Sequence, residues 1–204
     1  GTQSFILGAA GYLQIYFSTD QILVDETPSG GSYWTMRSTP VFRDPSAWYH
    51  CVFVYDSTQA TASNRFKVYI NNSEITSWVS DTRSNIVQNN GGRFNSAAEQ
   101  MICRQGHGSG NNYANVSLAD VHFIDGQALT PTDFGEFDDN NVWQAKEFAG
   151  SYTQPASGTT TTLSQTGWAT SDQANLWDGN TSTRAVGAAL NSVGTVFFSP
   201  PLTN

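Results

Sequence analysis

The sequence carries little charge, and positive charge is the scarcer kind. Only 13% of the 204 residues are charged, and 9 lysines and arginines stand against 17 aspartates and glutamates, which gives a formal net charge of −8 at pH 7. Binding to a nucleic acid backbone or to an anionic membrane surface depends on clustered cations. The composition therefore argues against nucleic acid and anionic membranes as partners.

Long apolar runs are absent as well. No stretch approaches the roughly 18 consecutive apolar residues that a transmembrane helix requires. Residues 1–4 contain none of the basic side chains that open a secretory signal. We therefore expect no insertion into a membrane.

Cysteine and histidine are too few, and too irregularly spaced, to form a metal site. Cys51 and Cys103 cannot build a disulfide framework and lack metal-ligand spacing; unpaired cysteine is commonly buried, so we expect both to be buried rather than bridged. His50, His107 and His122 show no zinc-binding spacing either. We expect structural imidazoles at His50 and His122, within strands, and a solvated His107 in a glycine-rich loop.

Aromatic residues, at 13%, and glycines, numbering 18, are plentiful. This composition is typical of half-buried sheets joined by turns, and it predicts an all-β protein. Asn71 and Asn72 form a credible tight turn, because asparagine tolerates the left-handed backbone conformation. Alternating apolar residues predict strands at 12–17, 21–24, 32–36, 48–55, 65–70, 74–78, 100–104 and 116–124.

One short helical segment is expected over residues 128–134. Thr130 can cap its start, Pro131 occupies the first helical position, and Asp133 lies in the first turn. We expect one or two turns of helix there.

The composition changes after residue 150. Residues 152–163 contain no charge and are dominated by Thr, Ser, Gly and Pro, which favours an exposed connector. Residues 174–183 and 193–198 are typical of the opening of another β unit. We therefore expect one domain at 1–150, and at 151–204 a Ser/Thr-rich connector followed by an incomplete second β module.

Three ordered blocks suggest a family. Residues 47–56 hold a Trp-x-His strand, residues 65–72 a strand that ends in Tyr-x-Asn-Asn, and residues 118–129 a strand that leads to Gln-Ala-Leu. In this order they resemble the laminin-G, pentraxin and concanavalin A-like superfamily. The resemblance implies an antiparallel β-sandwich, the concanavalin A-like jelly roll, for residues 1–150.

A narrower resemblance rests on residues 41–50, 123–136 and 142–150. These blocks are similar to virion structural proteins of tailed phages, especially cyanophages and other marine phages. The resemblance implies a non-enzymatic virion protein of a tail fibre, spike or capsid-attached appendage. Its partners would be other virion proteins, within a homo-oligomer such as a trimer. It also implies that Trp48 and Trp143 are packing residues.

Such a protein would serve assembly of the particle and adhesion to a glycan of the host surface. Aromatic rings at strand ends and in loops are suited to stack on sugars. The sequence-based candidates for carbohydrate binding are Tyr33, Trp34, Trp78 and Tyr113.

Calcium is the only cofactor that the sequence suggests, since many laminin-G-like and pentraxin domains bind it. Glu136, Asp138 and Asp139 lie in one acidic loop, and hard oxygen ligands are what Ca²⁺ requires. A solvated acidic turn is the favoured alternative, because the loop lacks the alternating ligand pattern of short calcium motifs.

Catalysis is not expected. Glycoside hydrolysis requires two carboxyl groups that face one cleft, whereas Asp120 and Asp125, five residues apart on a strand, should point to opposite faces. The alternatives to an adhesive virion protein are a glycan-cleaving or glycan-binding enzyme module on the same fold, or a purely structural capsid decoration protein.

Overall fold

A computed structural model of the chain describes residues 3–27, 31–44, 46–93, 96, 98–106 and 112–150, and the backbone of strand β13 (Asn191–Ser199). This part is built from antiparallel β-sheets, which confirms the all-β prediction. Its helical structure consists of the 3-10 turns η1 (Ala62–Asn64), η2 (Arg83–Asn85) and η3 (Pro131–Asp133). No helix in the described residues has the length and apolar character needed to span a membrane.

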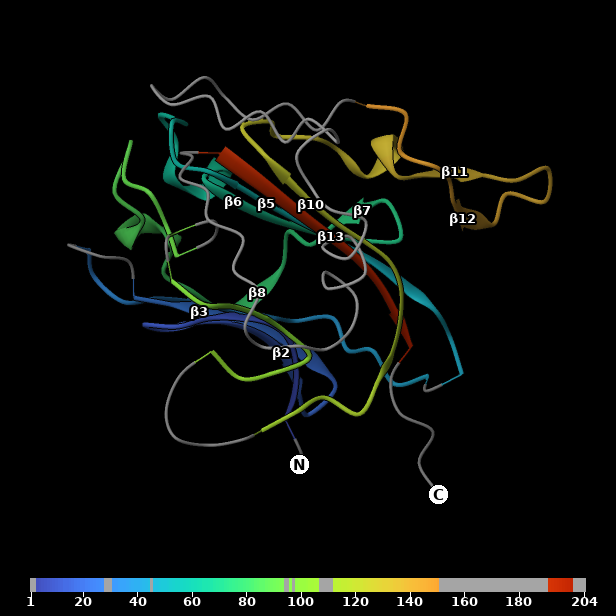
Figure 1. Cartoon of the computed structure of the whole chain (residues 1–204), viewed down its shortest axis with the longest axis horizontal. Coiled ribbons are helices and arrows are strands. Elements are labelled where there is room, and N and C mark those ends of the chain that lie inside the picture. The colour runs from blue at the N-terminus through green and yellow to red at the C-terminus, as the bar shows by residue number, and fades with distance from the viewer. Residues whose placement is uncertain are drawn as a thin grey trace, which may run out of the picture.

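Two sheets face each other (Figure 1). The six-stranded sheet has the order β8-β4-β3-β2-β1-β9, and the five-stranded sheet the order β10-β13-β5-β6-β7. The strands of the six-stranded sheet are β1 (Ser4–Ala9), β2 (Leu13–Ser18), β3 (Gln21–Glu26), β4 (Trp34–Ser38), β8 (Trp78–Asp81) and β9 (Gln100–Ile102). The five-stranded sheet contains β5 (Tyr49–Asp56), β6 (Phe66–Ile70), β7 (Ser73–Glu74), β10 (Ser117–Asp125) and β13. A separate hairpin of β11 (Gly135–Phe137) and β12 (Trp143–Ala145) extends beyond the edge of the sheets.

Most strands lie where the alternation of the sequence places them, with ends shifted by a few residues. Residues 74–78 are the exception, because they do not form one strand. The chain leaves the five-stranded sheet after β7 and enters the six-stranded sheet as β8. The alternation also missed β1, β11 and β12.

The turn between β6 and β7 has the predicted form. Asn71 and Asn72 have φ angles of 47° and 68°, and Ile70 pairs with Ser73 across them. Two consecutive left-handed residues are what a two-residue hairpin of the primed type requires. The turn therefore follows from the tolerance of asparagine for this conformation.

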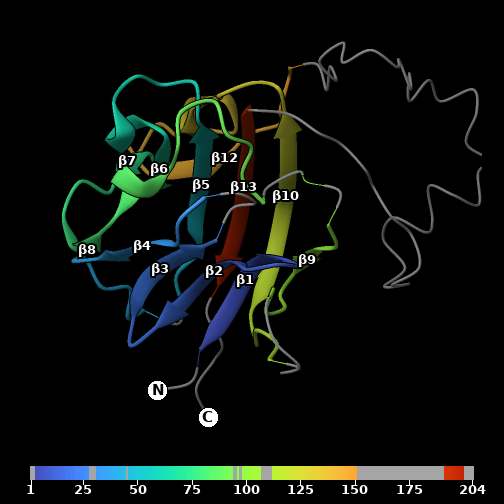
Figure 2. The same cartoon turned by 90° about the vertical axis from the view of Figure 1, so that its left-hand side faces the viewer.

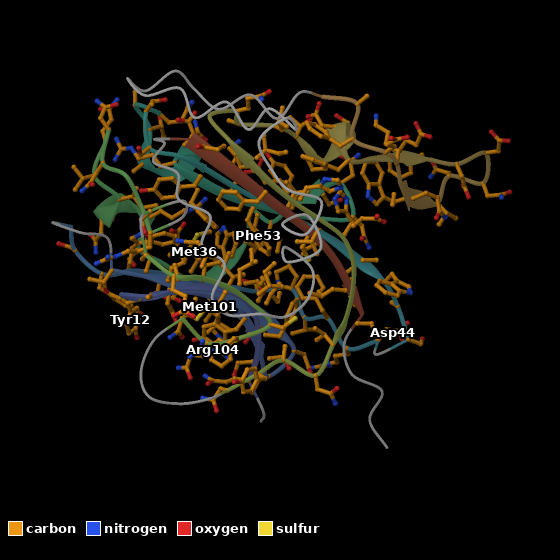
Figure 3. All side chains as sticks on the ribbon, in the orientation of Figure 1. Tyr12, Met36, Asp44, Phe53, Met101 and Arg104 are labelled. Carbon is orange, nitrogen blue, oxygen red and sulfur yellow. The ribbon has the colours of Figure 1, made fainter. Side chains whose placement is uncertain are left out.

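The main core lies between the two sheets. Alternate residues of each strand point inward, and the inward sets of both sheets form one buried apolar cluster. Figure 3 shows Met36 of the six-stranded sheet and Phe53 of the five-stranded sheet within this layer. Trp34 and Phe66 meet across it, with ring centroids 5.2 Å apart.

Both cysteines are unpaired, as expected. Cys51 is fully buried in the core, whereas Cys103 is only partly buried. Burial raises the pKa of both thiols. They are therefore neutral thiols near pH 7.

The outer face of the five-stranded sheet carries a second, smaller apolar cluster. Its buried members are Val52, Val54, Ile124 and Phe134. The predicted helical segment is a single 3-10 turn, η3, and it begins as expected: the backbone N–H of Thr130 donates to the Asp133 carboxylate at 2.7 Å. This bond satisfies a backbone donor at the start of the turn.

Strand β13 lies inside the five-stranded sheet, between β10 and β5 (Figure 2). It pairs with both neighbours along its length, for example Asn191 with Asp56. The assignment of residues 193–198 to a second β module beyond a boundary at residue 150 is therefore wrong, because this strand completes the first unit. Residues 151–190, which include the expected connector, lie outside the described residues.

Candidate functional site

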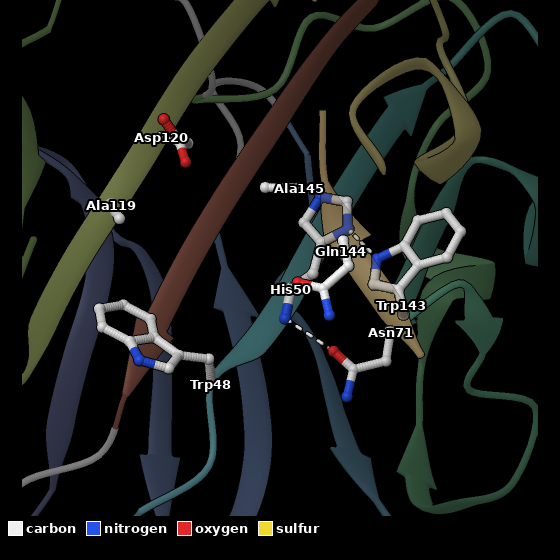
Figure 4. Close-up of a pocket in the computed structure, with 8 residues that line it drawn as sticks. All are labelled: Trp48, His50, Asn71, Ala119, Asp120, Trp143, Gln144 and Ala145. Atoms are coloured by element: carbon white, nitrogen blue, oxygen red, sulfur yellow. Dashed lines mark hydrogen bonds between the residues drawn. The ribbon is translucent and has the colours of Figure 1, made fainter. Parts of the chain in front are cut away.

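A pocket of about 220 Å³ lies where the outer face of the five-stranded sheet meets strand β12 (Figure 4). Its walls combine aromatic rings with carboxylate, amide and imidazole groups. In ligand sites, aromatic walls supply contact area and a few polar groups fix the orientation of the ligand. We call this cavity the tryptophan pocket. It is lined by two alanines and by Trp48, His50, Asn71, Asp120, Trp143 and Gln144.

The side chains of the tryptophan pocket come from segments far apart in the sequence. Trp48 directly precedes β5, and His50 is two residues further on, so the alternation of extended backbone directs both side chains to the outer face. Asn71 lies in the β6–β7 turn, and its Oδ1 accepts the backbone N–H of His50 at 2.8 Å. Asp120 lies on β10, where the register with β13 shifts and its φ is 49°. β12 contributes Trp143 from above the sheet.

His50 and Trp143 form a fixed wall of the pocket. The indole Nε1–H of Trp143 donates to Nδ1 of His50 at 2.8 Å, and the two rings lie nearly parallel, with an interplanar angle of 13°. Burial lowers the pKa of His50 to about 4, with a smaller contribution from His122. His50 is therefore neutral near pH 7, and because Nδ1 accepts, its ring proton lies on Nε2.

The position of Trp143 depends on Gly135, which lies beside it in the β11–β12 hairpin. A Cβ on Gly135 would lie 2.6 Å from Cε2 of Trp143 and even nearer to Cζ2. Gly135→Ala should therefore displace the indole, break its bond to His50 and lower the free energy of unfolding by about 1–3 kcal/mol. The Trp143 indole resonance in an ¹H–¹⁵N spectrum should move.

Gly91→Ala is the matched control for this prediction, because an added Cβ there meets no atom within 4 Å. It should leave the Trp143 indole resonance in place. An unchanged resonance in Gly135→Ala would contradict the close packing of Trp143 on Gly135.

The expectation that Trp34 offers its ring to a sugar is wrong. Its side chain is 0% exposed, and its indole N–H donates to the Glu26 carboxylate at 3.0 Å. Adjacent residues of a strand point to opposite faces. Of the neighbours Tyr33 and Trp34, Trp34 points into the core.

The three other sequence-based candidates do not meet in one site. Tyr33 is 44% exposed and lies just before β4, whereas Trp78 pairs with the far end of that strand. Trp78 is partly buried and lies under the guanidinium of Arg83, 5.4 Å from the centre of its ring system. Tyr113 is 61% exposed and forms a bridge with Arg104 close to the opposite edge of the sheet. None of the three lines the tryptophan pocket.

Trp48 is not the packing residue that the family resemblance implied. It is 51% exposed and lines the pocket, whereas Trp143 is partly buried and packs on His50. The sequence offered one signal for this site, the spacing of Trp48 and His50, which places both on one face. It could not show that β12 lies over that face.

The acidic hairpin turn provides no metal centre among the described residues. Glu136, Asp138 and Asp139 are all exposed. One Asp138 oxygen already accepts the backbone N–H groups of Asn140 and Val142, at 2.9 and 2.8 Å, and so closes the turn. In the part of the chain that the structure describes, no three His, Cys, Asp or Glu side chains are grouped to hold a metal ion. The calcium prediction gains no support from this geometry.

A pair of catalytic carboxylates is not found among the described residues that line the tryptophan pocket. Asp120 lines the pocket, but Asp125 does not. Glycosidases of the common type require two carboxyl groups on one cleft. The described lining supplies one.

Comparison of the chain with known protein families, with curated proteins and with solved structures finds no match in any of the three.

Proposed function

We propose that the chain is a non-catalytic adhesion module of a phage virion protein, and that the tryptophan pocket binds a carbohydrate of the host surface. The observation that carries this proposal is the exposed indole of Trp48 beside the polar groups of the same pocket. Sugar recognition uses an aromatic ring against the apolar face of a pyranose and planar polar side chains against its hydroxyls.

The polar groups of the pocket suit hydroxyl recognition. The side chains of Asn71 and Gln144 each carry a donor and an acceptor, and Asp120 accepts only. The bond from the His50 backbone to Asn71 and the bond from Trp143 to His50 hold this part of the pocket before any ligand arrives. A site that is already ordered loses less entropy on binding.

The virion context comes from the sequence resemblance, and the fold is compatible with it. Two antiparallel sheets with a shared core are what a concanavalin A-like jelly roll would display. Many copies on one particle, in a homo-oligomer such as a trimer and beside other virion proteins, would turn weak single-site binding into firm attachment. Immunogold labelling of purified virions tests this context, and absence of the protein from the particles would refute it.

A binding role is favoured over glycan cleavage because Asp120 is the only carboxylate among the described residues of the pocket lining. Release of reducing sugar from host polysaccharide by the unmodified protein would reverse this choice.

A purely structural decoration protein is the remaining alternative. It predicts that the protein binds neither to host cells nor to any glycan on an array.

Trp48→Ala tests the proposed site directly. Loss of an exposed stacking ring should weaken glycan binding at least tenfold, as at other aromatic binding hot spots. Because the side chain is half exposed, the free energy of unfolding should change by no more than about 0.5 kcal/mol. Glycan-array binding and urea denaturation give the two readouts.

Tyr113→Ala is the matched control, since Tyr113 is also a large, exposed aromatic residue but lies outside the pocket. It should bind like the unmodified protein. If both variants lose binding equally, or if neither variant loses binding, the tryptophan pocket is not the glycan site.

A further inference from the structure

The described residues that line the tryptophan pocket carry negative charge and no positive charge. Of the described residues that line it, Asp120 is the only acidic one, and none is a lysine or arginine. His50, the other titratable group of the lining, is held neutral by burial, which lowers its pKa to about 4. At neutral pH the described lining therefore carries a single negative charge.

Asp120 is exposed and lines the pocket. It lies at the irregularity of β10 and makes no salt bridge among those found in the described residues. Its φ of 49° is an uncommon conformation for a residue other than glycine. An aspartate without a cationic partner at a binding pocket attracts a ligand cation.

The aromatic wall favours the same kind of ligand. The faces of indole rings carry negative electrostatic potential and attract ammonium groups. Trp48 offers such a ring at half exposure, in the pocket lining that also holds the Asp120 carboxylate (Figure 4). An acidic sugar would meet repulsion from Asp120, and the described lining holds no cation to offset it.

We propose that the ligand of the tryptophan pocket is an amino sugar with a free ammonium group, which pairs with Asp120 while its ring stacks on Trp48. This inference rests on the proposed carbohydrate-binding function and specifies its ligand class. Neutral hexoses would bind through stacking and hydroxyl contacts alone, and uronic acids would be rejected.

Three tetrasaccharides of equal length test the charge preference: glucosamine tetramer, N-acetylglucosamine tetramer and galacturonic acid tetramer. Calorimetric or NMR titration of the full chain should rank them in that order. The glucosamine tetramer should bind about fivefold more tightly than its N-acetylated form, which is the gain from one exposed charge pair. Added salt should reduce that advantage.

Asp120→Asn should abolish the preference for the glucosamine tetramer over its N-acetylated form, because the charge pair that distinguishes the two sugars is lost. Glu99→Gln removes the same charge from an exposed residue outside the pocket and should preserve the preference. The NMR spectrum of each variant shows whether it is folded.

The outcomes separate this inference from the proposed function. Binding of the N-acetylated or galacturonic acid tetramer as tightly as the glucosamine tetramer, or an unchanged preference in Asp120→Asn, would overturn the amino-sugar assignment and leave glycan binding intact. Binding of other array glycans but of none of these tetramers would also overturn it. Absence of any glycan binding would refute the proposed function itself.

Discussion

Trp34→Ala should lower the free energy of unfolding by about 4 kcal/mol, the scale of a large aromatic side chain removed from a packed core. The indole is fully buried and contacts Phe66 across the layer between the sheets. Its N–H is one of the donors to the buried Glu26 carboxylate, which would lose that partner. Urea denaturation followed by circular dichroism gives the measurement.

Two further variants make the Trp34 prediction specific. Trp34→Phe keeps most of the ring but removes the N–H donor, so we expect a loss of about 2 kcal/mol. Trp48→Ala, at an exposed tryptophan, should cost about 0.5 kcal/mol or less. A Trp34→Ala protein with the stability of the unmodified chain would mean that this side chain is not in the core.

The buried carboxylate of Glu26 should make the fold less stable as the pH rises from about 4.5 to 7. Glu26 is 0% exposed, and burial raises its pKa from 4.5 to about 7, partly offset by the N–H donors of Arg93 and Trp34. A carboxyl group whose pKa is higher in the folded protein than in the unfolded chain stabilises the folded state. Its full contribution is present when the pH is below the pKa of the group in the unfolded chain. This contribution is lost as the pH approaches the folded pKa, and it amounts to about 3 kcal/mol.

Glu26→Gln isolates this contribution, because the histidines act in the opposite direction. Burial lowers the pKa values of His50 and His122, so their contributions grow as the pH rises through the same range. The amide introduced by Glu26→Gln cannot ionise. Because its single oxygen replaces the two carboxylate oxygens that accept N–H donors, the variant should be less stable than the unmodified protein at pH 4.5. The test is therefore the slope of unfolding free energy against pH. Equal slopes in both proteins would contradict the assignment to Glu26.

Local features of the fold could be predicted from the sequence because local physics decides them. The alternation around β5 places its strand, Asn71 and Asn72 set their turn through their tolerance of positive φ, and Asp133 caps η3. In each case the residues that decide the structure lie within a few positions of it.

Features that depend on distant partners could not be predicted in this way. Alternation shows that Tyr33 and Trp34 face opposite sides, but only the position of the second sheet decides that Trp34 is inside. The pocket at Trp48 likewise requires Trp143, which reaches it from another element. The candidate site was missed because its walls are joined by tertiary packing.

The place of β13 in the sheet also constrains how the protein is made. During synthesis, β5 and β10 leave the ribosome well before their common neighbour, since Asp56 pairs with Asn191. Among the residues that the structure describes, the six-stranded sheet uses none beyond Ile102, so these strands can assemble first. Such high contact order predicts slow closure of the five-stranded sheet. Until then the nascent chain exposes two unpaired strand edges, the kind of intermediate that chaperones protect from aggregation.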